Sequence, residues 1–346
     1  MKRIAVFQTD LKIGGIQNSL ISLLDELSHK EVQIDLFLGE MIEPHSGWNN
    51  ISIRKMRRYS SLFKFIPFSF AHAMNKRRFD KEKYDLVIDY NGYAFDTAHG
   101  SLSCNAEKHV IWVHSDYDTR IKYNKKFRIL WRMMKGKYAR FDQAVVVSPG
   151  AEKSFKRLLG DKIPTRILPN LVDAEKILRM KEEQVKMNLD ASKYHLVTMG
   201  RMVHSKGFDL LLELFSSVLK HRKDMVLHLI GDGEEKDKLE AQAERLGLAD
   251  SVVFWGNQKN PYAIMDRMDG FAFTPRYEGQ GLVLLEAKIL GLEIFTTRQM
   301  EKFNVMISGV DDLEKALIEA AKKTKEYQQL KEYNSEVRKE IQELML

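Results

Sequence analysis

Residues 270–290 read GFAFTPRYEGQGLVLLEAKIL and contain the most informative pattern of the chain. The apolar residues 270–274 predict a short buried strand, and the run 282–290 predicts a helix. A turn with two glycines lies between them and carries Glu278, while Glu286 falls one turn into the helix. Backbone N–H groups at such a helix start favour an anion, and carboxylates accept hydrogen bonds from hydroxyl groups. The stretch therefore predicts a site for a ligand with phosphates and hydroxyls, such as a sugar nucleotide.

Apolar strands alternate with amphipathic helices along the whole chain, which indicates α/β layers with parallel sheets. In the first half we expect strands at 4–8, 33–38, 86–90, 110–114 and 144–148. In the second half we expect strands at 196–199, 226–230, 252–255 and 270–274, with helices at 208–221, 234–246 and 262–268 between them. Because 346 residues are many for one core, we predict two doubly wound domains, 1–170 and 171–325. We also predict a charged helical tail from residue 311 onwards, with a final helix at 326–346 that packs back on the first domain.

The composition predicts a cytoplasmic protein. Cys104 is the only cysteine, so an internal disulfide and a cysteine metal site are excluded, and a reducing compartment is expected. The apolar run near Met1 is too short for a signal peptide. No uninterrupted apolar stretch has the length that a membrane-spanning helix requires.

The positive charge is concentrated in the first half of the chain. Residues 1–170 contain 29 Lys and Arg against 18 Asp and Glu, whereas the remaining residues contain 26 against 30. Two basic segments, 54–70 and 120–140, interleave cations with large apolar residues. This pattern is typical of a helix that contacts an anionic membrane surface, and equally of a solvated helix face whose apolar side lies in the core. No nucleic-acid readout module accompanies the high pI, so we expect no nucleic-acid partner.

Polar residues follow several predicted strands of the second half. Arg201 and Lys206 bracket a short loop after the strand at 196–199, where two cations can hold a diphosphate. A structural role for both at a helix end is the alternative. Asn257 follows the strand at 252–255, in a loop that can read the edge of a base. The carboxyl ends of parallel strands meet at one edge of a sheet, so we expect these residues to share one site with Glu278 and Glu286.

The motifs Gly200-Arg201, Lys206-Gly207 and Gly231-Asp232-Gly233, with the pair Glu278 and Glu286, resemble the donor half of glycosyltransferase family four. These retaining enzymes have the GT-B fold, in which two Rossmann-like doubly wound domains face each other across a cleft. The resemblance covers residues 196–297 strongly and 1–173 more loosely. It implies that Arg201 and Lys206 contact the donor diphosphate, that Glu278 binds hydroxyls of the donor sugar, and that Glu286 binds the ribose hydroxyls. The backbone amides along the sugar and phosphates would be those of Gly279, Gln280, Gly281, Leu282 and Val283.

The same resemblance extends to three residues of the first half. Gly14 and Gly15 open a helix after the first strand and match the glycine-rich loop that faces the donor phosphates. His114 ends a strand where family members place a histidine near the reacting sugar. A plain turn at the glycines and a structural histidine are the alternatives. The aspartates at 116 and 118 have the spacing of a metal motif found in another glycosyltransferase fold, but cations already neutralise the diphosphate, so we expect neither metal nor cofactor.

Together with this resemblance, these observations predict a glycosyltransferase, retaining as the resemblance implies, that moves a sugar from a nucleotide-diphosphate sugar, with UDP-sugars favoured, to a hydroxyl of a saccharide acceptor. In the front-face displacement of the family, the leaving phosphate accepts the acceptor's proton. The basic first half favours a lipid-linked acceptor in cell-surface or capsular polysaccharide synthesis, with the enzyme peripheral on the inner face of the membrane. Two alternatives remain at this point: a sugar-nucleotide epimerase or hydrolase of the same fold, and a non-catalytic partner subunit of another glycosyltransferase.

Overall fold

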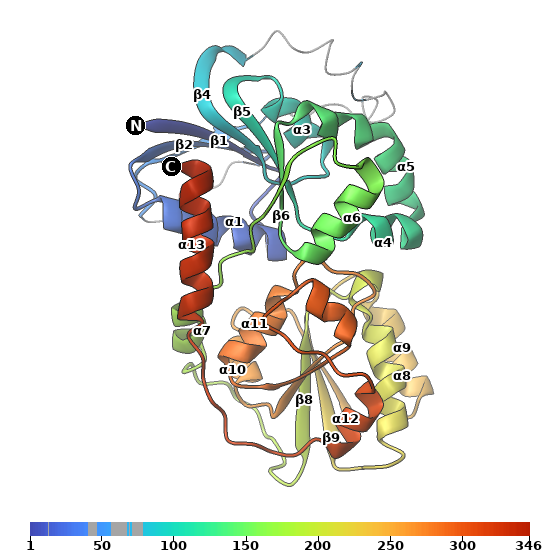
Figure 1. Ribbon diagram of the computed structural model, residues 1–346. Coiled ribbons are helices and arrows are strands. Elements are labelled where there is room, and N and C mark those ends of the chain that lie inside the picture. The colour runs from blue at the N-terminus through green and yellow to red at the C-terminus, as the bar shows by residue number, and fades with distance from the viewer. Residues whose placement is uncertain (13, 41–46, 57–67, 69, 71–78) are drawn as a thin grey trace. The chain divides into compact units, whose positions relative to one another are not determined.

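The chain forms two α/β units (Figure 1). The computed structural model describes all residues except 13, 41–46, 57–67, 69 and 71–78. Unit 1 contains Met1–Leu171 and Glu332–Leu346, and unit 2 contains Val172–Lys331. The C-terminal helix α13 (Lys331–Met345) therefore belongs to unit 1, although unit 2 precedes it in the chain.

Unit 1 is built on a seven-stranded parallel sheet in the order β3-β2-β1-β4-β5-β6-β7. The strands are β1 (Lys2–Gln8), β2 (Val32–Leu38), β3 (Ile51–Lys55), β4 (Phe79–Asp89), β5 (Cys104–Val113), β6 (Gln143–Val146) and β7 (Thr165–Ile167). Besides α13, the helices among the described residues of this unit are α1 (Gly15–Leu27), α3 (Phe95–Ser101), α4 (Tyr117–Tyr123), α5 (Lys125–Met134), η3 (Lys135–Arg140) and α6 (Pro149–Leu159). The strand order reverses between β1 and β4, and ligands of such sheets bind beyond the carboxyl ends of the strands at this point.

Unit 2 is built on a five-stranded parallel sheet in the order β10-β9-β8-β11-β12. The strands are β8 (Tyr194–Met199), β9 (Met225–Ile230), β10 (Val252–Gly256), β11 (Gly270–Phe273) and β12 (Glu293–Thr296). The helices are α7 (Ala174–Met180), η4 (His204–Lys206), α8 (Phe208–Val218), α9 (Lys236–Arg245), α10 (Tyr262–Met265), α11 (Leu282–Ile289), η5 (Arg298–Lys302) and α12 (Leu313–Glu319). The order reverses between β8 and β11, so the loops after these two strands are the expected ligand loops.

The core of unit 2 follows from the spacing of its apolar side chains. Leu227 and Leu229 of β9 lie two residues apart and are buried on the same face of the sheet. Leu211, Leu212 and Phe215 of α8 follow the spacing of one helix face and are buried in the same cluster. Helices α8, α9 and α12 thus cover one face of this sheet, and the strand ends remain for polar loops.

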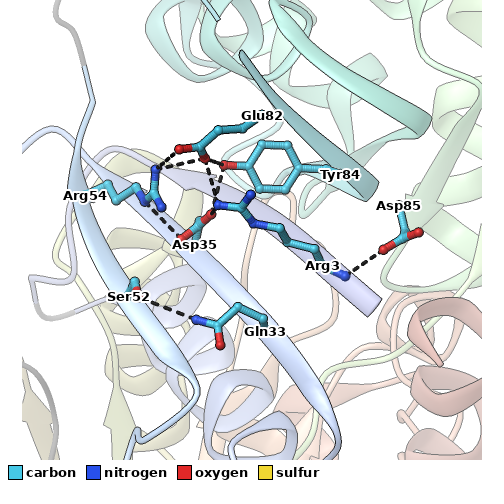
Figure 2. A network of polar contacts seen from close by, with 8 residues as sticks. All are labelled: Arg3, Gln33, Asp35, Ser52, Arg54, Glu82, Tyr84 and Asp85. Carbon is cyan, nitrogen blue, oxygen red and sulfur yellow. Dashed lines mark hydrogen bonds and ion pairs between the residues drawn. The ribbon is translucent and has the colours of Figure 1, made fainter. Parts of the chain in front are cut away.

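A network of charged side chains joins β1, β2, β3 and β4 of unit 1 (Figure 2). Asp35 is 1% exposed and binds Arg3 at 2.8 Å and Arg54 at 2.9 Å. Glu82 binds the same two arginines at 2.8 and 2.9 Å, and the Tyr84 hydroxyl lies 2.8 Å from Glu82 and 2.9 Å from Asp35. The hydrogen bonds from Arg54 and Tyr84 hold the pKa of Glu82 below its usual range. Since a buried carboxylate is costly without partners, the network fixes the relative positions of these four strands.

The structure confirms the predicted strands and adds three that the sequence analysis omitted. The omitted strands β3, β7 and β12 lie at sheet edges and have only five, three and four residues. Such short segments, about half of them polar, contain too few residues to show a period of two. Predicting strands from apolar runs therefore found the central strands and the edge strand β10 (Val252–Gly256), and missed the three shorter or more polar edge strands.

The prediction of a helical tail from residue 311 onwards is wrong in its middle part. Residues 320–330 form no helix and separate α12 from α13. Lys325 donates to the Asp266 carbonyl, Lys323 pairs with Glu293 at 2.5 Å, and the Gln328 amide donates to the Ile289 carbonyl at 3.0 Å. Polar groups of this segment are therefore satisfied by the body of unit 2, which replaces the hydrogen bonds that a helix would supply.

Candidate functional site

The loops after β8 and β11 of unit 2 bring two predicted site residues into contact. Lys206 ends η4 in the first loop, and Glu278 lies in the second. The Lys206 Nζ forms an ion pair with the Glu278 Oε2, while the Glu278 Oε1 accepts a hydrogen bond from the Gly279 amide at 3.0 Å. A cation suited to phosphate and a carboxylate suited to hydroxyls therefore stand side by side at the switch point of the sheet.

Arg201 lies two residues after the end of β8 and is exposed. Its side chain forms no hydrogen bond or ion pair with other described residues. The guanidinium has five N–H donors that match phosphate oxygens. Arg201 is therefore available to an anionic ligand at the same edge as Lys206.

Glycines allow the site loops to pack backbone against backbone. A Cβ at Gly231 would lie 2.0 Å from the Gly200 carbonyl oxygen, and one at Gly207 would lie 2.0 Å from the Thr274 carbonyl oxygen. Both glycines also have positive φ angles, +132° and +65°, which other residues rarely adopt. The glycines of the predicted motifs thus hold the loops after β8, β9 and β11 against one another.

Helix α11 begins directly after the glycine turn. Gly281 precedes it with φ 71° and ψ 55°, and no side chain caps the helix start. Gly279 and Gly281 are buried, Gln280 is 4% exposed, and Leu282 and Val283 are half-buried. The first amides of a helix have no partner within the helix, so an uncapped start favours an anion.

Glu286 lies on α11 and faces Tyr262 of α10. The Tyr262 hydroxyl donates to the Glu286 Oε1 at 3.2 Å. The glutamate keeps part of its surface accessible, yet dense protein around its carboxyl raises the pKa to about 7, against the lowering effects of Tyr262 and Lys206. Asn257 is exposed in the loop after β10, which leads into α10. Glu286, the predicted ribose contact, therefore touches α10, and Asn257, the predicted base contact, lies in the loop that leads into the same helix.

Three predicted site residues lie in unit 1, also after strands. Gly14 precedes α1 without a side-chain cap, and a Cβ built at Gly15 would meet nothing within 4 Å, so the space beside it is open. The His114 Nε2 lies 2.8 Å from the Tyr90 carbonyl. Because a carbonyl only accepts, Nε2 carries the proton and Nδ1 is left as an acceptor. Burial lowers the pKa of His114 to about 4, so the ring is neutral at physiological pH.

The sequence analysis missed two residues that shape this site, Tyr262 and Arg276. Tyr262 meets Glu286, and Arg276 binds Asp209 through two hydrogen bonds of 2.6 and 2.5 Å. Tyr262 begins the helix that we expect at 262–268, and Arg276 lies within residues 270–290. Only the strand order shows which distant residue each one meets, so a local pattern could not have found these contacts.

Asp116 and Asp118, which have the spacing of a metal motif, bind groups of the protein itself. Asp116 caps α4 through a 3.0 Å bond from the Thr119 amide, and Asp118 pairs with Arg157 at 2.5 Å and Lys122 at 3.2 Å. Within the described part of the chain, no group of three or more potential metal ligands occurs. That the reaction needs no metal or cofactor stays a prediction.

The second basic segment, residues 120–140, has both a buried apolar side and an exposed basic side. Phe127, Trp131 and Met134 of α5 are buried, so its apolar side belongs to the core. Lys125 and Lys126 are exposed on the same helix. In the first basic segment, Arg57 and Arg58 lie outside the described residues. No helix among the described residues is both long and apolar enough to span a membrane.

Comparison with known proteins places both halves of the chain in glycosyltransferase families. The family described as Glycosyltransferase Family 4 matches residues 13–176, and the family described as Glycosyl transferases group 1 matches residues 179–337. The lipopolysaccharide core biosynthesis glycosyltransferase LpsD of Rhizobium meliloti is 30% identical over 79% of this chain and 72% of its own length. The alpha-monoglucosyldiacylglycerol synthase of Streptococcus pneumoniae is 22% identical over 89% of this chain and 75% of its own.

A solved structure agrees with this assignment at the level of the fold. The Anabaena protein HepE, in complex with UDP-glucose, superposes with a TM-score of 0.61 at 16% identity, over 99% of this chain and 91% of that one. The alignment with one curated relative covers 48% of that relative's length, and the alignments with three others cover 72–76%. The predicted fold of two Rossmann-like domains is confirmed by these matches and by the two parallel sheets. The chain therefore belongs to glycosyltransferase family 4 and is a glycosyltransferase of the GT-B fold.

Proposed function

We propose that this glycosyltransferase takes a sugar from a UDP-sugar and transfers it, with retention of configuration, to a hydroxyl of a lipid-linked saccharide. The observation that carries the proposal is the contact between Lys206 and Glu278 beside the exposed Arg201. Two cations suit a diphosphate, and the adjacent carboxylate suits the hydroxyls of the sugar attached to it. In unit 2, all three follow the strands at which the sheet order reverses.

In this proposal each residue around the switch point of unit 2 contacts one part of the donor. Arg201 and Lys206 bind the diphosphate and stabilise the charge that develops on it as the sugar departs. Glu278 orients the donor sugar, and Glu286 accepts hydrogen bonds from the ribose hydroxyls. Asn257 contacts the base. The backbone along the sugar and phosphates is that of Gly279, Gln280, Gly281, Leu282 and Val283.

The chemical step forms a bond between the acceptor oxygen and the anomeric carbon and breaks the bond from that carbon to the β-phosphate oxygen. The acceptor's proton passes to the departing phosphate oxygen on the same face of the sugar, so no protein base is needed. His114 is neutral at physiological pH and keeps Nδ1 as an acceptor. In this scheme it receives a hydrogen bond from a sugar hydroxyl, and the amides near Gly14 and Gly15 approach the phosphates.

The choice of UDP and of a surface-glycan acceptor is supported by related proteins. HepE binds UDP-glucose, and LpsD acts in lipopolysaccharide core biosynthesis. The S. pneumoniae relative is named for a glucosylated diacylglycerol. We carry these properties to this chain as a proposal: a UDP-sugar donor, and an acceptor attached to a lipid.

We further propose that the exposed cations of α4 and α5 hold the enzyme at an anionic membrane. Lys125 and Lys126 are exposed, and two large apolar side chains stand beside them, Tyr123 at 56% and Ile129 at 63% exposure. Exposed cations with exposed apolar side chains bind the interface of anionic lipid bilayers. The double variant Lys125→Glu with Lys126→Glu is expected to lose sedimentation with vesicles that contain anionic phospholipid.

The matched control for this membrane test lies in unit 2. Changing the exposed residues Lys220 and Lys223 to Glu alters the net charge by the same amount on the acidic half of the chain. This control should sediment as the wild type does. Equal sedimentation of both variants would contradict the proposal that α4 and α5 bind the membrane. It would not bear on the proposed transfer reaction.

A thermal-shift screen of UDP, GDP and ADP tests the donor assignment. A ligand that binds only the folded state raises the melting temperature. We expect UDP to raise it and GDP and ADP to leave it nearly unchanged. The shift with UDP should fall in Glu286→Ala, and an undiminished shift in that variant would contradict the ribose assignment.

A further inference from the structure

Arg276 belongs to the loop that carries Glu278, but its side chain contacts the loop that carries Lys206. The guanidinium makes two parallel hydrogen bonds to Asp209 of α8, at 2.6 and 2.5 Å. Its Nη1 also donates to the His204 carbonyl at 3.1 Å. The Arg276 side chain is 15% exposed, and that of Asp209 is 34% exposed. Such a bidentate, charge-assisted pair is among the strongest polar contacts that proteins make.

Two further hydrogen bonds to backbone carbonyls join the same two loops at the same place. The Arg276 amide donates to the Ser205 carbonyl at 2.9 Å, and the Thr274 hydroxyl donates to the Gly207 carbonyl at 3.0 Å. Gly207 lies so close to Thr274 that a Cβ would collide with its carbonyl oxygen. Two segments about 70 residues apart in sequence are therefore fastened together directly beside Lys206 and Glu278.

We propose that Arg276 is a positioning residue for donor binding, which fixes the Lys206 loop against the Glu278 loop through Asp209 and the His204 carbonyl. This inference rests on the proposed function, because it assigns Lys206 and Glu278 to the donor. Lys206 reaches its place on a flexible four-carbon stem, so its location depends on the backbone that carries it. A displacement of about 1 Å in a binding group can cost about 100-fold in rate. The guanidinium acts indirectly, since its bonds go to protein groups of the other loop.

Substitution of Arg276 tests this role when UDP affinity, donor kinetics and melting temperature are measured together. Arg276→Met is expected to weaken UDP binding at least tenfold and to lower kcat/KM for the donor by a similar factor. The KM for the acceptor should stay within a factor of two. Asp209→Asn, which keeps the shape of its side chain, should shift UDP affinity in the same direction and serves if Arg276→Met does not fold.

Arg222 provides a matched control for a purely structural effect. It also makes a bidentate pair with an aspartate, Asp224, at 3.0 and 2.8 Å, and it donates to backbone carbonyls near Ala320. This pair lies just before β9, at the amino ends of the strands of the same sheet, whereas Lys206 and Glu278 lie beyond the carboxyl ends. Arg222→Met should lower the melting temperature about as much as Arg276→Met does, and it should leave UDP affinity unchanged.

A double-mutant cycle separates an effect through Lys206 from a general one. If Arg276 positions Lys206, then Lys206→Met should weaken UDP binding much less in the Arg276→Met background than in the wild type. Fully additive effects, or an unchanged UDP affinity in Arg276→Met while Lys206→Met weakens binding, would overturn the positioning role alone. Failure of the wild type to bind any nucleotide diphosphate would refute the proposed function and this role with it.

Discussion

Replacement of Glu286 by glutamine should stabilise the ligand-free protein at alkaline pH and weaken its binding to UDP. Glu286 lies in a densely packed part of unit 2, where burial raises its pKa from the ordinary value of 4.5 to about 7. A buried carboxylate that is reserved for a ligand is a cost to the empty protein. Glutamine has nearly the same shape, can still accept a hydrogen bond from Tyr262, and carries no charge.

The sign and size of this effect follow from the pKa. The pKa of Glu286 is higher in the folded than in the unfolded state, so the free energy of unfolding falls as pH rises from about 4.5 through about 7. The full difference corresponds to about 3 kcal/mol in the free energy of unfolding. Because Glu286 keeps some access to water, part of this cost is relieved, and we expect Glu286→Gln to gain about 1–3 kcal/mol at pH 8. At pH 5 the gain should be less than about 1 kcal/mol.

Urea denaturation at pH 5 and at pH 8, followed by circular dichroism, measures this difference. Glu244→Gln is the matched control, because Glu244 is exposed on α9 of the same unit. Its free energy of unfolding should differ from that of the wild type by less than about 0.5 kcal/mol at both pH values. A calorimetric titration should show UDP binding at least tenfold weaker in Glu286→Gln.

Two results would refute this reasoning. If Glu286→Gln were less stable than the wild type at pH 8, the buried carboxylate would be a stabilising group in the empty protein. If the variant gained stability but bound UDP as tightly as the wild type, Glu286 would have no part in the donor site. Only a gain in stability together with a loss of affinity fits both the structure and the proposed role.

Three further predictions concern other parts of the structure. Lys206→Ala should lower kcat/KM for the donor by about 100-fold in steady-state assays, because a preorganised cation at the leaving group is lost; an effect below threefold would exclude Lys206 from the site. Asp35→Asn should lower the free energy of unfolding by about 1–3 kcal/mol, because it removes a buried charge from between Arg3 and Arg54, and an unchanged urea midpoint would contradict that. Gly207→Ala should lower the free energy of unfolding by at least about 2 kcal/mol in the same measurement. The control Gly247→Ala, with φ +70° but open space around it, should lower it by about 1 kcal/mol. Equal losses in the two variants would contradict the close contact between the loops.

The sequence was sufficient for those parts of the fold that local pattern determines. The central strands are almost wholly buried, so β1, β8 and β9 appear in the sequence as mainly apolar segments, interrupted only by single polar residues such as His195, Thr198 and His228. Edge strands such as β12 are short and half-exposed, and they lack that pattern. The segment 320–330 has the charged composition of a helix, but contacts with unit 2 determine its conformation.

Candidate site residues could be proposed one by one from the sequence, whereas the contacts between them could not. The spacing of Glu278 and Glu286 and the glycines around them are visible in a single stretch of sequence. The contact between Lys206 and Glu278 requires that β11 lies beside β8, which is a property of the strand order. The raised pKa of Glu286 and the bond from Arg276 to Asp209 likewise depend on packing between distant segments. Strand order and burial are therefore what the structure adds.

The central claim is the transfer of a sugar from a UDP-sugar to a lipid-linked acceptor with retention of configuration. The most direct measurement incubates the wild type with radiolabelled UDP-sugars and a lipid extract, and then determines the anomeric configuration of the isolated glycolipid by NMR. The account predicts a labelled glycolipid whose anomeric configuration is that of the donor, and about 100-fold slower formation of this product with Lys206→Ala. A glycolipid of inverted configuration, or free sugar as the sole product whatever the acceptor, would contradict it.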